Sequence, residues 1–169
     1  LNAVSTLEAI ENVQANMLQV NAAICANAGM FVASSSSMGA LSNVSSSPDG
    51  RTWTLRAMPS SQSWVAASDG SGFLAIADSA SAVAYSAAGT SWASATALPG
   101  TPQYSSKALA AVSGRYIVRG SATTTTIYST INNGTSWTTE TAPAASLDNI
   151  WSVNGLFFAQ ASASNAYYT

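Results

Sequence analysis

Gly72-Phe73-Leu74-Ala75-Ile76 is the stretch that decides the fold prediction, because it has three counterparts elsewhere in the chain. Each copy is a glycine followed by four mainly apolar residues, which is typical of a buried strand that begins after a turn. The other copies are Gly29-Met30-Phe31-Val32-Ala33, Gly114-Arg115-Tyr116-Ile117-Val118 and Gly155-Leu156-Phe157-Phe158-Ala159. The four glycines are spaced 43, 42 and 41 residues apart. Such regular spacing predicts a tandem repeat of about 40 residues.

The residues around each strand-opening glycine predict further strands. Turn-forming residues precede the glycines, and an apolar segment such as Trp64–Ala67 comes before the turn, which together indicate a hairpin. Downstream, another apolar stretch ends on a hydroxyl residue, as in Tyr85-Ser86 and Tyr128-Ser129, and indicates a third strand. A tight turn, a tryptophan and a fourth segment then follow. Four strands in about 40 residues are typical of one propeller blade.

The turn before each tryptophan has a recurring pattern of hydroxyl, acceptor and glycine residues. Asp49 or Asn132 can accept backbone N–H bonds from residues further along its turn, while the glycine adopts positive φ. Ala88 replaces the acceptor in the second turn, which we therefore expect to be weaker. The predicted turn boxes comprise Ser47, Asp49, Gly50, Thr52 and Trp53; Ser86, Gly89, Ser91 and Trp92; and Thr130, Asn132, Gly134, Ser136 and Trp137.

The third turn matches the pattern Ser/Thr-x-Asp/Asn-x-Gly-x-Ser/Thr-Trp and so resembles the Asp-box (BNR-like) repeat of sialidase-like β-propellers. The first two turns are one residue shorter. This resemblance implies an all-β, propeller-like array of four-stranded blades, three complete and a fourth truncated. It also implies that the box is an architectural turn at the blade edge and not a catalytic element. Its tryptophan is expected to pack the turn against its own blade or the next.

The repeat divides the chain into a lead-in, residues 1–17, and blades over about 18–61, 62–103, 104–146 and 147–169. Ser5 and Glu8 form a potential capping box, and the apolar spacing after them predicts a short N-terminal helix. This helix is expected to pack across the propeller or lead in from an upstream domain, with a trimerisation stalk as the alternative. Thr169 matches the first residue of a fourth box, so we expect a longer chain or a larger assembly to complete that blade.

Charge is scarce in this sequence: only 7% of the residues are Asp, Glu, Lys or Arg, and histidine is absent. Five basic residues stand against seven acidic ones, so no basic patch is expected to neutralise a phosphate backbone or an anionic membrane. We therefore predict neither nucleic-acid binding nor membrane insertion. Cys25 has no second cysteine with which to form a disulfide, and its apolar neighbours predict a buried thiol.

The family resemblance implies a set of catalytic residues that this sequence does not provide. Sialidase-like propellers use an arginine triad, a Tyr/Glu pair and an aspartate, whereas this chain has four arginines in unsuitable places and no convincing carboxylate pair. Arg115 and Arg119 are expected to share a solvated strand face, and Asp69 and Asp78 to serve in hairpin turns. No catalytic residue, metal ligand or cofactor is predicted.

Aromatic residues are the remaining candidates for ligand contacts. The tryptophans of the turn boxes are expected in the core or between blades, and Trp64 and Trp151 are expected to be buried at strand starts. Tyr104, Tyr116 and Tyr167 are candidates for stacking on a sugar, but the sequence locates no ligand site.

These features favour a non-enzymatic structural or adhesion module. The first hypothesis is a bacteriophage tail or fibre protein, at a virion or extracellular surface, that contacts host-surface glycans and other protein subunits, a trimer being one possibility. The second is a cellular propeller scaffold used in the assembly of a larger complex. The third is a fragment of a glycosidase-like propeller.

Overall fold

The structure is a computed structural model that describes residues 22–35, 43–78, 80–102, 108–121, 125–142, 147–161 and 166–168. The predicted N-terminal helix and Thr169 lie outside these residues. Everything that is described is β-strand, turn or irregular chain, so the all-β prediction is confirmed.

The strands form four antiparallel sheets, in each of which the strands follow one another in chain order. We call these sheets 1 to 4. Sheet 1 contains β1 (Ala22–Asn27), β2 (Met30–Ser35), β3 (Asn43–Ser47) and β4 (Thr54–Ala57). Sheet 2 contains β5 (Trp64–Ser68), β6 (Phe73–Ala77), β7 (Val83–Ser86) and β8 (Ala93–Ser94). Sheet 3 contains β9 (Leu109–Val112), β10 (Arg115–Arg119), β11 (Thr126–Thr130) and β12 (Thr138–Thr141). Sheet 4 contains β13 (Leu147–Val153), β14 (Leu156–Ala161) and β15 (Ala166–Tyr168).

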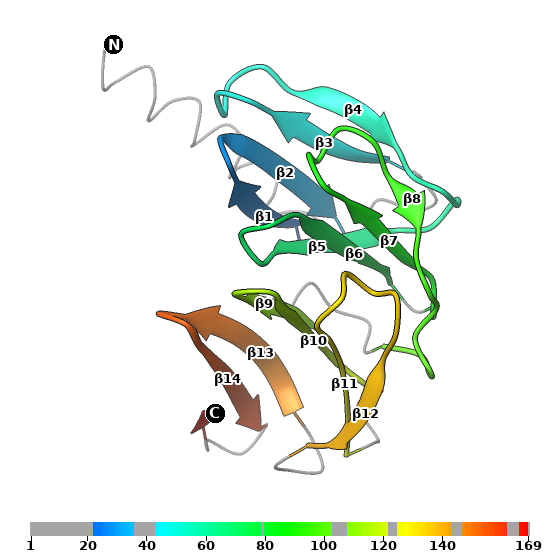
Figure 1. The fold of residues 1–169 in the computed structure, drawn as a ribbon, viewed down its shortest axis with the longest axis vertical. Helices are drawn as coiled ribbons and strands as arrows, with labels where there is room; N and C mark the ends of the chain where they lie inside the picture. Colours follow the sequence, from blue (N-terminus) through cyan, green and yellow to red (C-terminus); the bar gives the residue numbers. More distant parts are fainter. Residues whose placement is uncertain are drawn as a thin grey trace.

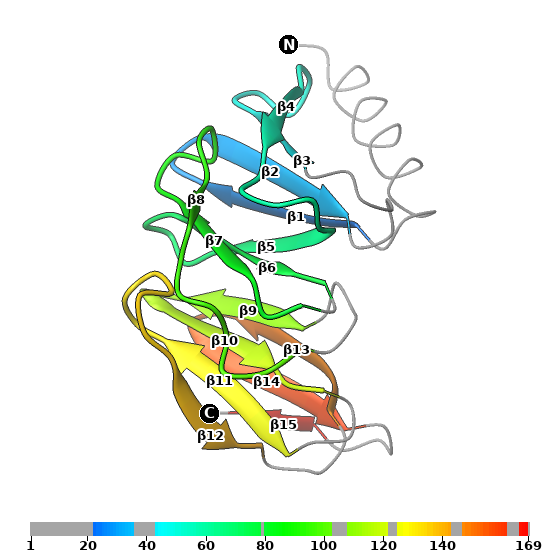
Figure 2. The same cartoon turned by 90° about the vertical axis from the view of Figure 1, so that its right-hand side faces the viewer.

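The four sheets stack in chain order, so that sheet 1 and sheet 4 lie at opposite ends of the array (Figures 1 and 2). The first strand of each sheet contacts the first strand of the next, from β1 to β5, from β5 to β9 and from β9 to β13. The first strands therefore form the spine of the array, while the later strands of each sheet lie further out. This radial repetition of short antiparallel sheets is the arrangement of propeller blades.

The first hairpin of each sheet shows why glycine recurs with the repeat. In sheets 1, 3 and 4 the two turn residues both have positive φ, for example Ser113 at 34° and Gly114 at 85°, as a two-residue type I′ turn requires. Sheet 2 differs, because four residues separate the paired Ser68 and Phe73. Gly72 stands next to this strand without positive φ, and a Cβ there would lie 2.3 Å from the Tyr85 hydroxyl. Glycine is needed at position 72 because the Tyr85 side chain approaches the backbone closely there, and not because the turn requires it.

The hydrophobic core lies between the sheets, because both faces of the inner strands carry apolar side chains. In β5, alternate residues point to opposite sides: Trp64 and Ala66 pack towards sheet 1, and Val65 and Ala67 towards sheet 3. All of β6 is buried for the same reason. A smaller cluster, which includes Ile117, Leu147 and Ile150, joins sheets 3 and 4.

Candidate functional site: the turn boxes and the tip pocket

The first turn box is closed by hydrogen bonds from its own side chains. Asp49 Oδ1 accepts the backbone N–H groups of Arg51 at 2.8 Å and Thr52 at 2.9 Å, and Ser47 Oγ accepts that of Gly50 at 2.9 Å. The bonds from Thr52, Arg51 and Ser47 lower the pKa of Asp49. Gly50 has a φ of 72°, which continues the turn without steric cost.

The third box repeats this geometry with an amide in place of the carboxylate. Asn132 Oδ1 accepts the N–H of Ser136 at 3.0 Å, and Thr130 Oγ1 accepts that of Gly134 at 3.1 Å. In the second box Ser86 Oγ accepts the N–H of Gly89 at 2.8 Å, and Ala88 has no side-chain acceptor to offer. The expectation that this second turn is weaker remains a prediction.

The second and third turn boxes also contact the preceding sheet. Trp137 Nε1 in sheet 3 donates to the carbonyl of Thr96, which follows β8, at 2.8 Å, and the Thr96 N–H donates to the Gly134 carbonyl at 3.0 Å. Trp92 is buried in the cluster that contains Val32 and Val44 of sheet 1. The sequence led us to expect contact with the tryptophan's own blade or the next. Both tryptophans do pack in clusters that contain residues of their own sheet, and the other sheet in each cluster is the preceding one. Trp53 of the first box is partly buried.

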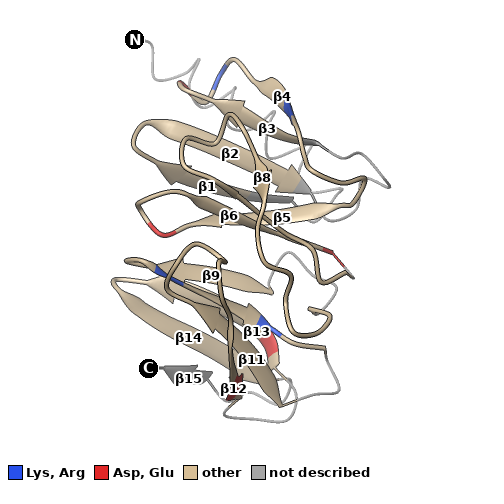
Figure 3. Ribbon diagram, turned by 45° about the vertical axis from the view of Figure 1, so that its right-hand side comes forward, with Lys and Arg blue, Asp and Glu red and all other residues tan. Residues whose placement is uncertain are grey.

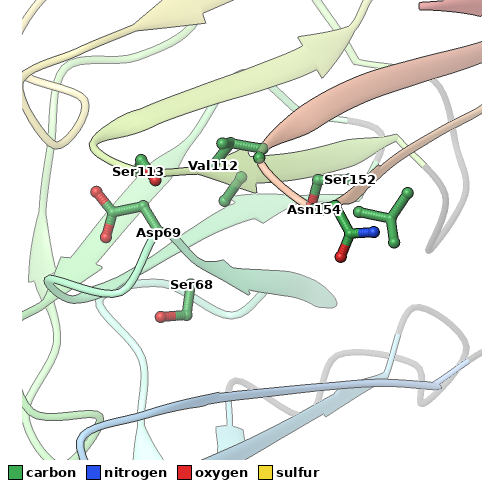
Figure 4. A pocket seen from close by; sticks show the side chains of 9 residues that line it. Ser68, Asp69, Val112, Ser113, Ser152 and Asn154 are labelled. Atoms are coloured by element: carbon green, nitrogen blue, oxygen red, sulfur yellow. The ribbon is translucent and has the colours of Figure 1, made fainter.

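A pocket of about 220 Å³ lies where the first hairpins of sheets 2, 3 and 4 converge (Figure 4). We call it the tip pocket. Its polar side chains are Ser68 and Asp69 from sheet 2, Ser113 from sheet 3, and Ser152 and Asn154 from sheet 4. The apolar part of the wall comes from Ala111, Val112 and Val153, and Gly155 completes it. Ser113 and Asn154 have positive φ in their I′ turns, so the hairpins that repeat along the sequence also position the polar groups of this pocket.

Asp69 is the one charged residue of the tip pocket, and its carboxylate is already engaged. Its Oδ1 accepts the backbone N–H groups of Ser71 at 2.9 Å and Gly72 at 3.1 Å, and both carboxylate oxygens accept the Ser71 hydroxyl. Burial raises the pKa of Asp69, but hydrogen bonds from Ser71, Tyr116 and Gly72 outweigh it and hold the pKa below its usual value. Asp69 is therefore ionised at neutral pH and closes its own turn.

Tyr116 links the pocket to the core. Its hydroxyl donates to the Gly72 carbonyl at 3.2 Å, and burial together with the neighbouring Asp69 raises its pKa far above the usual value. Because the side chain is fully buried, it is not available to stack on a sugar. Tyr104 lies outside the described residues, as does the side chain of Tyr167.

Two expectations about individual residues are wrong. Trp151 is 38% exposed and stacks on Phe158 with ring centroids 5.7 Å apart, because it faces away from sheet 3. Arg119 is buried, while Arg115 at the other end of β10 is exposed. Burial lowers the pKa of Arg119, and the charge of Asp148 partly offsets this effect. The shared strand face is solvated only at the Arg115 end, because β10 runs from an exposed turn into the packed part of the array.

Charged residues elsewhere are sparse and scattered along the ribbon of the array (Figure 3). Within the described ranges, no three His, Cys, Asp or Glu side chains gather closely enough to hold a metal ion. No helix in the described part is long and apolar enough to cross a membrane.

The sequence matches no protein family model. It also has no significant match among curated proteins. Solved structures, in contrast, show clear similarity. A streptogramin B lyase superposes with a TM-score of 0.63 at 8% identity, over 86% of this chain and 52% of the lyase. The GH74 enzyme of Niastella koreensis gives 0.60 at 18% identity, over 86% of this chain and 22% of the enzyme. YCF48 bound to a D1 peptide gives 0.59 at 17% identity, over 89% of this chain and 52% of YCF48.

These similarities concern the fold, since all three identities are low. The chain spans about half the length of the lyase and of YCF48, and less than a quarter of the GH74 enzyme. The sheet arrangement and the three superpositions agree with the prediction made from the repeat: the described chain is an all-β array with the architecture of part of a β-propeller.

Proposed function

We propose that this chain is a non-enzymatic structural and adhesion module that binds an uncharged, hydroxyl-rich ligand, such as a glycan, in the tip pocket. The observation that carries the proposal is the lining of that pocket. Sheets 3 and 4 contribute the Ser113 and Ser152 hydroxyls and the Asn154 amide to one place. The Ser68 hydroxyl and the Asp69 carboxylate of sheet 2 are used to close their own turn.

This lining suits recognition better than catalysis. Serine and asparagine side chains both donate and accept hydrogen bonds, which matches the hydroxyl groups of a sugar. Asp69, held ionised by its neighbours, has no proton to give at neutral pH, and a general acid needs one. The volume of about 220 Å³ is below the roughly 300–1,000 Å³ of pockets that enclose drug-sized ligands, so the pocket fits part of a ligand such as a terminal sugar.

The setting we propose is the tail or fibre of a bacteriophage, or another extracellular surface, where the chain works with further protein subunits. Two features support this setting: the low content of charged residues and the tandem repeat. An adhesion module needs an extended surface more than it needs a catalytic centre, and a repeat array provides such a surface. A cellular assembly scaffold is the alternative, and the similarly folded YCF48, described as bound to a D1 peptide, gives it a precedent.

Glycan-array screening followed by calorimetric titration of the best ligand would test the proposal. The variant Asn154→Gly removes a pocket amide and keeps the positive-φ turn, so we expect binding to weaken several-fold, up to about 10-fold for one lost hydrogen bond. Asn133→Gly is the matched control, because Asn133 also has positive φ but lies in the third turn box, outside the pocket. Absence of binding to any glycan, or equal effects of the two variants, would contradict the proposal.

A further inference from the structure

Four dipeptides in this chain join an aspartate or asparagine to a glycine, and all of them lie in described turns: Asp49-Gly50, Asp69-Gly70, Asn133-Gly134 and Asn154-Gly155. In such a pair the glycine nitrogen can attack the side-chain carbonyl carbon of the residue before it, because glycine has no Cβ to hinder the approach. The product is a five-membered succinimide ring. Whether this reaction proceeds in the folded protein depends on what holds the glycine N–H group and its turn.

Three of the four glycine N–H groups are held by a serine or threonine hydroxyl at the start of the same turn. The N–H groups donate to these oxygens as follows: Gly50 to Ser47 Oγ at 2.9 Å, Gly70 to Ser68 Oγ at 3.2 Å and Gly134 to Thr130 Oγ1 at 3.1 Å. A nitrogen whose hydrogen is engaged in this way must first break that bond. Asp49 and Asp69 have a second protection, because their lowered pKa keeps them as carboxylates, which resist attack.

The Gly155 N–H group lacks this protection. Asn154 and Gly155 form the two-residue I′ turn between β13 and β14, and the ladder of the hairpin begins at the flanking pair of Val153 and Leu156. No acceptor for the Gly155 N–H group is present in the described part of the chain. This difference is set by the hydrogen-bonding pattern inside the turn, so it does not depend on which blades flank sheet 4. The I′ turns of sheets 1 and 3 have alanine and serine at the position of the asparagine, and neither carries an amide that could react.

The Asn133-Gly134 pair provides an internal comparison, because the two asparagines share a backbone conformation. Their φ angles are 60° for Asn133 and 50° for Asn154. Besides its hydrogen bond, Gly134 is buried, and a Cβ placed on it would lie 3.2 Å from Leu74 Cδ1 of sheet 2. A Cβ on Gly155 would meet nothing within 4 Å. The third turn box is therefore held against its neighbour, whereas the hairpin tip has room to open locally.

We propose that Asn154 is a self-modification site, at which the side-chain amide is converted to a carboxylate in the tip pocket. The Gly155 nitrogen attacks Asn154 Cγ and gives up its proton to water, the Cγ–Nδ2 bond breaks, and Nδ2 leaves as ammonia. Water then opens the succinimide at one of its two carbonyl carbons, which yields aspartate or isoaspartate. The net reaction consumes one water and releases one ammonia. The pocket of about 220 Å³ has room for several waters, since each occupies about 30 Å³.

The modification changes the chemistry of the tip pocket. Asn154 loses the NH₂ group that donates hydrogen bonds, and a second carboxylate joins that of Asp69. The consequence for ligands rests on the proposed function: an uncharged, hydroxyl-rich ligand loses a donor, so its binding should weaken several-fold, up to about 10-fold. Asn154→Asp reproduces the aspartate product for a calorimetric titration, and Asn133→Asp adds the same charge outside the pocket. Equal affinities of the two variants would overturn this consequence.

Peptide-mapping mass spectrometry tests the modification itself and needs no ligand. The 169-residue chain is incubated at mildly alkaline pH, samples are digested under acidic conditions, and isoaspartate peptides are separated by chromatography. In the native protein we expect Asn154 to convert about 5-fold or more faster than Asn133, the factor that one lost hydrogen bond supports. In urea the two rates should approach each other, because the hydrogen bond and the packing of the third turn box are lost.

Thr130→Val tests the cause of the difference. This variant removes the acceptor of the Gly134 N–H group, so it should speed the conversion of Asn133 and leave that of Asn154 unchanged. Thr138→Val, on an exposed strand, is the matched control and should change neither rate. Circular dichroism shows that both variants are folded. Equal native rates at the two asparagines, a difference that persists in urea, or an Asn133 rate that Thr130→Val does not raise would overturn the proposal. Failure to bind any glycan would leave it standing, because the reaction is intramolecular.

Discussion

Replacing Gly89 by alanine tests the role of the turn boxes in joining the sheets. Gly89 has a φ of 73°, where a Cβ costs about 1–2 kcal/mol. The added Cβ would also lie 2.8 Å from Val32 Cγ2 of sheet 1 and 3.2 Å from Phe73 Cε2, both on fully buried side chains. Overpacking of this kind costs about 1–3 kcal/mol. We therefore expect Gly89→Ala to lower the free energy of unfolding by about 2–5 kcal/mol.

Gly114→Ala separates the two contributions to this loss. Gly114 has a φ of 85°, but a Cβ there would meet no atom within 4 Å. Its substitution should cost only the backbone term, about 1–2 kcal/mol. Urea unfolding followed by far-UV circular dichroism and by tryptophan fluorescence measures both variants, and coincident transitions from the two probes would justify a two-state treatment.

A double-mutant cycle between Gly89 and Val32 identifies the contact itself. Val32→Ala removes the methyl group that the new Cβ would meet, so the double variant should lose less stability than the sum of the two single variants. If Gly89→Ala costs no more than Gly114→Ala, or if the two losses simply add, the second turn box does not press against sheet 1 and the reasoning is refuted.

Three further predictions concern a turn box, a buried acid and the cysteine. Thr130→Val removes the acceptor of the Gly134 N–H and should cost about 1–2 kcal/mol in urea unfolding, whereas Thr138→Val, on an exposed strand, should stay within about 0.5 kcal/mol. Burial raises the pKa of Asp78 to about 6, so the folded state holds this proton more tightly than the unfolded state and stability should fall as the pH rises from about 4 to about 6. Asp78→Asn should flatten that decline, and an unchanged profile would contradict the assignment. Burial raises the pKa of the Cys25 thiol to about 12, so iodoacetamide should label the native protein much more slowly than the urea-unfolded chain between pH 7 and 9; equal rates would show an accessible thiolate.

The repeat and its strands could be predicted from the sequence because they depend on local chemistry. A positive-φ glycine, an apolar tetrapeptide and a hydroxyl-capped turn specify a hairpin through residues close together in the chain. The hydrogen bonds of Asp49 and Asn132 within their own turns show this locality, since each acceptor bonds residues at most four positions away. Gly72 is the exception, because the close approach of Tyr85 is a contact across the sheet.

The candidate site could not be predicted in the same way. Asp69, Ser113 and Asn154 come from three successive repeats, and each reads on its own as a turn residue. Their convergence depends on the angle and distance at which whole sheets stack. The spacing of the repeat predicts that equivalent hairpins exist, but it carries no information about the size of the space between their tips.

By itself the sequence determined that this protein is a tandem array of short antiparallel sheets with capped turns, because strand and turn propensities act over a few residues. The tertiary structure decided which faces of those sheets are covered. Trp151 and Trp64 both belong to apolar first strands, yet Trp64 is buried against sheet 1 and Trp151 is exposed on the side of sheet 4 that faces away from sheet 3. Likewise, Arg119 is buried at one end of a strand whose other end carries the exposed Arg115. Whether a residue is buried depends on the sheets that stacking places against it, and the residue's own segment of sequence carries no information about those sheets.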